Sequence, residues 1–96
     1  VYAARPPAHE VKGGSTINWT LSIPPNAAAH RVTADHEFDR DVVLRSFNPH
    51  MHLRGRSFEY RVVLPGGTED VLLSVPRYDF NWQHTYVLAE PRRVPK

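Results

Sequence analysis

The sequence predicts an all-β fold, an antiparallel β-sandwich of jelly-roll type, from two observations. Short apolar stretches are separated by nine prolines and five glycines, which favour strands and turns over helices. No stretch carries the apolar spacing of an amphipathic helix, whereas several alternate apolar and polar residues as half-buried strands do. Many short strands joined by turns are typical of an antiparallel sandwich or barrel.

The first half of the chain contains three predicted strands. The clearest is 16–23, where apolar and polar residues alternate strictly until Pro24 and Pro25 end the pattern. A second strand is predicted at 30–38 and a third at 41–53. Because a proline cannot donate to a strand ladder, we expect a bulge or an edge position near Pro49.

The second half is predicted to contain a hairpin. Segments 57–64 and 69–75 flank Pro65-Gly66-Gly67-Thr68, and glycines there can take the positive φ of a tight turn. An aromatic-rich loop at 78–83 and one more strand at 84–88 follow. We expect Tyr78, Phe80 and Trp82 to be core residues, because aromatic rings bury large areas.

A chain of 96 residues is one domain or part of one. Both ends fall in mid-pattern, so we expect a piece of a longer protein. Residues 1–14 are predicted to be a linker or the end of a preceding domain, and 15–96 an incomplete, N-terminal portion of the sandwich.

Composition excludes several classes of function. The net charge of +2 comes from 12 basic and 10 acidic residues that are interspersed, which is not a nucleic-acid footprint. The lack of cysteine excludes disulfides, zinc ribbons, iron–sulfur clusters and thiol catalysis within this sequence. No apolar run approaches the roughly 18 residues of a membrane span.

The candidate site is the pair His50 and His52. Residues two apart on a strand project from the same face, with Cα atoms about 6.8 Å apart. Their imidazoles can therefore converge on one metal ion, each nitrogen about 2 Å away, while Met51 points to the opposite side. Imidazole suits copper, zinc, iron and nickel, so the pair does not choose the metal. The alternative is two surface histidines on a polar face.

Other polar residues carry weaker signals. His84 could approach the pair as a third ligand, but we favour a solvated or hydrogen-bonded strand histidine. His36 lies between two carboxylates that, on a strand, face away from it, so those three residues cannot converge on one ion. Arg54 and Arg56 either orient an anionic substrate or pair with acidic residues, namely Glu59 and Asp70.

Two sequence blocks resemble a known family. Residues 47–56 read Phe-Asn-Pro-His-Met-His-Leu-Arg-Gly-Arg, and residues 75–83 read Val-Pro-Arg-Tyr-Asp-Phe-Asn-Trp-Gln. Together, and with the entry at Ile23-Pro24-Pro25, they resemble the C-terminal catalytic domain of the copper type II, ascorbate-dependent monooxygenases, in its bacterial version. That family includes peptidylglycine α-hydroxylating and dopamine β-monooxygenases. The resemblance covers most of residues 15–96.

The resemblance implies that His50 and His52 bind the copper at which oxygen is activated and a small-molecule substrate is hydroxylated. It also implies a methionine thioether as third ligand, which we expect beyond residue 96, and an electron-transfer copper in a preceding domain. The segment alone is therefore not expected to be active. The family and its copper chemistry imply a periplasmic or secreted location.

Two rival functions remain open. One is a metal-binding module for copper storage, sensing or delivery, and the other is a purely structural sandwich in which the histidines take no part. An incomplete sandwich also exposes strand edges, so self-association is a further expectation.

Overall fold

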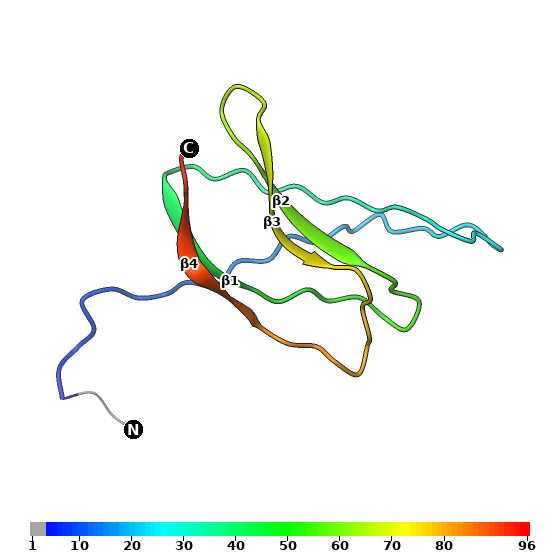
Figure 1. Cartoon of the computed structure of the whole chain (residues 1–96), viewed down its shortest axis with the longest axis horizontal. Helices are drawn as coiled ribbons and strands as arrows, with labels where there is room; N and C mark the ends of the chain where they lie inside the picture. The colour runs from blue at the N-terminus through cyan, green and yellow to red at the C-terminus, as the bar shows by residue number, and fades with distance from the viewer. Residues whose placement is uncertain (1–3) are drawn as a thin grey trace. The chain divides into compact units, whose positions relative to one another are not determined.

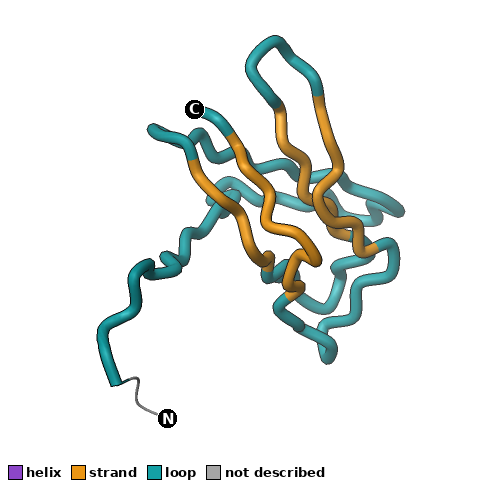
Figure 2. The backbone as a smooth tube through the Cα atoms, turned by 60° about the vertical axis from the view of Figure 1, so that its left-hand side comes forward, coloured by secondary structure: helices purple, strands orange, loops and turns teal. Residues whose placement is uncertain are grey.

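The computed structural model describes residues 4–96 and contains only strands, turns and loops (Figures 1 and 2). Within those residues the strands are β1 (Val42–Phe47), β2 (Phe58–Val63), β3 (Glu69–Val75) and β4 (Tyr86–Val94). β1 pairs with β4 and β2 with β3, both antiparallel. The predicted all-β class is confirmed, and the jelly-roll arrangement stays a prediction. The described part of the chain has no helix that could cross a bilayer.

The chain divides into two compact units, one ending at His36 and the other spanning Glu37–Lys96. All of the regular strands belong to the second unit. Residues 1–3, the start of the predicted linker, lie outside the described residues. Residues 4–14 contain no strand and are exposed.

The β2–β3 hairpin forms where the sequence predicts it. Gly66 and Gly67 have φ values of 95° and 87°, the left-handed region that suits glycine. The turn is closed by Leu64 N–H donating to Thr68 O at 2.8 Å and Gly67 N–H donating to Leu64 O at 2.9 Å. This hairpin is specified locally, by its turn residues.

The β1–β4 pair is irregular at its centre. Between Leu44 and Ser46 on β1 the partner on β4 changes from Arg92 to Val87, so the ladder carries a bulge. The extra β4 segment includes Pro91, which has no N–H to donate. The irregularity predicted near Pro49 is therefore found earlier in the chain, between Leu44 and Ser46 of β1. Pro49 lies beyond the end of β1 and is fully buried.

The β1–β4 pair and the β2–β3 hairpin of the second unit contact each other around a small core. Val62, Val75 and Val94 are its buried aliphatic residues. The ring of Phe47 on β1 stacks on that of Tyr60 on β2, with centroids 4.4 Å apart. Burial raises the pKa of the Tyr60 phenol. An ion pair between Arg92 and Asp70 also joins β4 to β3.

The predicted strands at 16–23 and 30–38 are wrong. The two segments touch through the Asn18 side-chain amide, which donates to Thr33 O at 2.8 Å, but they form no ladder. Pro24 begins the turn between them, as Ala27 N–H donates to Pro24 O at 3.3 Å. The apolar side of 16–23 is uncovered: Trp19 is 85% exposed and Leu21 56%. Alternation indicates a strand only where a second layer buries the apolar face.

Candidate metal centre

His50 and His52 lie in the loop that follows β1 and not on the strand predicted at 41–53. β1 ends at Phe47, ahead of the buried Pro49, whose ring lacks the N–H that would continue the ladder. The strand geometry from which the pair was predicted is therefore absent. The two imidazole rings are nevertheless close to each other, with centroids 5.2 Å apart.

That separation fits a shared ion. With each nitrogen about 2 Å from a tetrahedral metal, two imidazole centroids would lie about 5 Å apart. The rings meet at 82°, edge to face, so the same separation also suits direct contact between two neutral rings. Both side chains are exposed to solvent.

Tyr78 fixes the backbone between the two histidines. Its hydroxyl donates to Met51 O at 2.8 Å and accepts from Met51 N–H at 2.9 Å. Both bonds are half-buried and join residues 27 positions apart in the sequence. Tyr78 N–H also donates to Arg56 O at 2.8 Å, which fastens the far end of the same loop. The aromatic-rich loop at 78–83 therefore supports the loop that carries His50 and His52.

Gly55 closes this loop tightly. Its N–H donates to His52 O at 2.8 Å. A Cβ at this position would lie 2.7 Å from Met51 Cβ and 3.0 Å from Met51 Cε. The Met51 side chain is thus turned toward Gly55, while the neighbouring imidazoles lie close to each other.

The loop between β3 and β4 supplies the second contact to the pair. Gln83 Oε1 lies 2.5 Å from His50 Nδ1, and Gln83 Nε2 donates to Phe80 O at 2.8 Å. The Phe80 ring stands edge-on to His52, with centroids 6.4 Å apart. Asp79 Oδ1 accepts from Asn81 N–H at 2.8 Å and shapes the turn. Sequence reasoning did not single out Gln83 as a site residue, and its only signal was membership of the second block.

A complete metal site is not found in residues 4–96, where no three His, Cys, Asp or Glu side chains could hold an ion together. His84 precedes β4, so the favoured strand position for His84 is wrong; its ring meets that of Trp82 edge to face, with centroids 4.4 Å apart. His36 is exposed and belongs to the other unit. The two imidazoles alone fit copper and zinc equally, and the expected methionine ligand stays a prediction.

Two further expectations are corrected. Glu59 pairs with Arg61 at 2.5 Å, and Asp70 pairs with Arg92, so neither carboxylate neutralises Arg54 or Arg56. Trp82 is 66% exposed and is not a core residue. Tyr78 and Phe80 are half-buried, so they are not part of the buried core either.

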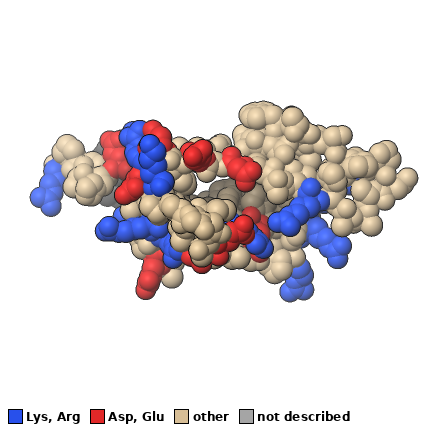
Figure 3. Space-filling view, turned by 90° about the horizontal axis from the view of Figure 1, so that it is seen from above, with Lys and Arg blue, Asp and Glu red and all other residues tan. Residues whose placement is uncertain are grey.

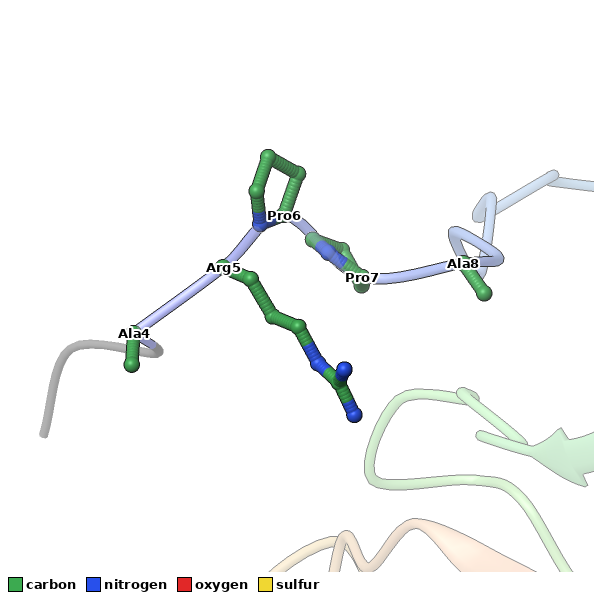
Figure 4. Close-up of a pocket in the computed structure, with 5 residues that line it drawn as sticks. All are labelled: Ala4, Arg5, Pro6, Pro7 and Ala8. Carbon is green, nitrogen blue, oxygen red and sulfur yellow. The ribbon is translucent and has the colours of Figure 1, made fainter.

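A hollow bounded by Ala4, Arg5, Pro6, Pro7 and Ala8 is a bend of one exposed segment and not an enclosed cavity (Figure 4). Both basic and acidic side chains appear on the face seen in Figure 3.

Comparison with protein-family models, with curated proteins and with solved structures found no match.

Proposed function

We propose that this chain is part of a copper-dependent, monooxygenase-like oxidoreductase in which His50 and His52 hold the oxygen-activating copper. The observation that carries the proposal is the approach of the two imidazole rings to 5.2 Å in a loop that two separate sequence blocks support. Loops fastened to a sheet are common places for binding groups, because the scaffold fixes them while solvent and substrate reach them.

The bound copper would supply activation of dioxygen for hydroxylation of a small-molecule substrate. The chain's own residues would do three things. His50 and His52 would provide two nitrogen ligands, Tyr78 would hold their backbone in place, and the edge of Phe80 would shield one side of His52 from water. The third ligand, a thioether beyond residue 96, would favour Cu(I). We place the protein in the periplasm or outside the cell.

Titration with Cu(I) under anaerobic, reducing conditions tests the metal-binding part of the proposal. We expect one copper per chain, and X-ray absorption at the copper edge should report imidazole nitrogen ligands. His50→Ala and His52→Ala should each weaken binding by more than the about 10- to 100-fold that loss of an outer partner costs. His9→Ala is the matched control, because His9 is also exposed and belongs to the other unit. Equal affinity in all four proteins would contradict the proposal.

The full-length protein, of which we propose this chain to be a part, distinguishes an enzyme from a metal-binding module, because the segment alone is not expected to be active. Oxygen uptake by the copper-loaded protein in the presence of ascorbate is expected for the oxidoreductase. Tight copper binding without oxygen uptake would instead support storage, sensing or delivery. Unchanged metal content in a His50→Ala, His52→Ala double variant would support the purely structural alternative.

A further inference from the structure

The amide of Gln83 can be oriented without ambiguity. A backbone carbonyl has no hydrogen to donate, so the Gln83 atom 2.8 Å from Phe80 O must be the nitrogen, Nε2. The other end of the amide, Oε1, then faces His50 Nδ1 at 2.5 Å. The reverse orientation would bring two acceptor oxygens together at Phe80.

The orientation of Gln83 decides where the His50 proton lies. An amide oxygen only accepts, and a neutral imidazole has one N–H and one bare nitrogen. The short contact to Oε1 is a hydrogen bond only if Nδ1 carries the proton. Nε2 of the neutral ring then keeps its lone pair, and a metal requires such a nitrogen.

We infer that Gln83 is a positioning residue, which holds neutral His50 as the Nδ1–H tautomer and commits Nε2 to ligand binding. The inference rests on the proposed function only where it says that His50 Nε2 binds copper. The Nδ1–H tautomer is expected in the metal-free chain as well. An outer partner that orients a ligand imidazole also raises its basicity, which strengthens the bond to the metal.

The Gln83 side chain is held within its own short loop. Phe80 O receives the Gln83 amide three residues later, and the turn between them is shaped by Asp79. The hydrogen bond to His50 spans 33 positions of sequence. Because both side chains are exposed, water competes for the same atoms, and we expect an effect on affinity at the low end of the usual range.

The test uses the metal-free chain at an alkaline pH of about 9. Long-range proton–nitrogen NMR spectra of the labelled chain report which ring nitrogen is protonated. In the wild-type chain we expect His50 to carry the proton on Nδ1. Gln83→Leu removes the acceptor and should move the population toward Nε2–H. The tautomers of His9 and His30 serve as internal references.

Gln83→Glu separates the positioning role from a structural one. It keeps an acceptor oxygen for His50 but loses the donor to Phe80 O, so it should preserve the Nδ1–H tautomer. Gln83→Leu should weaken Cu(I) binding by about 10-fold, whereas Gln83→Glu should retain most of the affinity. An unchanged amide fingerprint for β1 to β4 would show that both variants fold.

Three results would overturn the inference: a wild-type His50 protonated on Nε2, a tautomer unchanged by Gln83→Leu, or a Glu variant that behaves as the Leu variant does. Failure of the proposed function looks different. A chain with the Nδ1–H tautomer that binds no copper would contradict the metal centre and leave the role of Gln83 intact.

Discussion

Gly55 matters because a side chain there has no room. The nearest atoms to a Cβ are Met51 Cβ at 2.7 Å and His52 O at 3.0 Å, both belonging to the loop that carries the imidazoles. A Cβ contact below 3 Å forces one partner to move. Displacement of Met51 or of His52 O would change the angle between the two rings.

We therefore expect Gly55→Ala to destabilise the chain by about 1 to 3 kcal/mol, the usual cost of overpacking. It should also weaken copper binding, because the two imidazoles would no longer be held in the mutual geometry that suits one ion. Denaturant unfolding and copper titration measure the two effects. Gly13→Ala is the matched control, since its Cβ would meet nothing within 4 Å. Equal stability of the two variants would contradict the prediction, because it would show that the loop accommodates the Cβ without loss of stability.

At the scale of elements, the site depends on two connections and not on the strands themselves. The loop after β1 carries the histidines, and the loop between β3 and β4 carries Tyr78 and Gln83. The Tyr78 hydroxyl satisfies both polar groups of the Met51 backbone, which would otherwise be left half-buried and unpaired. One side chain thus couples the positions of two loops.

Tyr78→Phe should destabilise the chain by about 1 to 3 kcal/mol, because the Met51 N–H and C=O both lose their partner. Amide hydrogen exchange at Met51 should become faster. Tyr86→Phe in β4 is the control, since it removes the hydroxyl of another half-buried tyrosine. Exchange at Met51 that stays as slow as in the control would contradict this role of Tyr78.

At the scale of the whole chain, apolar surface is left uncovered. Ile17, Trp19 and Leu21 are each more than half exposed on one segment. Contiguous exposed apolar residues of this kind mark places where another surface packs. We predict that the chain associates with itself through this segment.

Sedimentation over a range of concentrations should therefore show reversible association of the chain. A Trp19→Ser, Leu21→Ser double variant should shift the population toward monomer, because it removes the largest exposed apolar groups of the segment. Trp82→Ser is the matched control, as Trp82 is also exposed, at 66%, but lies in the other unit. A monomer at all concentrations would contradict the prediction.

Local features were predictable from the sequence. The β2–β3 hairpin depends on two glycines with positive φ, and the nearness of His50 and His52 depends on two positions within one short loop. The all-β class follows from the same short-range pattern of apolar stretches and turn residues. Each of these features depends on residues close together in the chain, so the amino-acid sequence is enough to predict it.

Other features were decided by contacts between distant parts of the chain. The alternation at 16–23 forms no strand, since nothing in the described residues covers Trp19 and Leu21. Gln83 and Tyr78 became site residues because the chain returns to the histidine loop about 30 positions later. A periodic pattern states which side chains could be buried or brought together. Only the packed structure supplies the second surface that buries them or the partner atom that meets them.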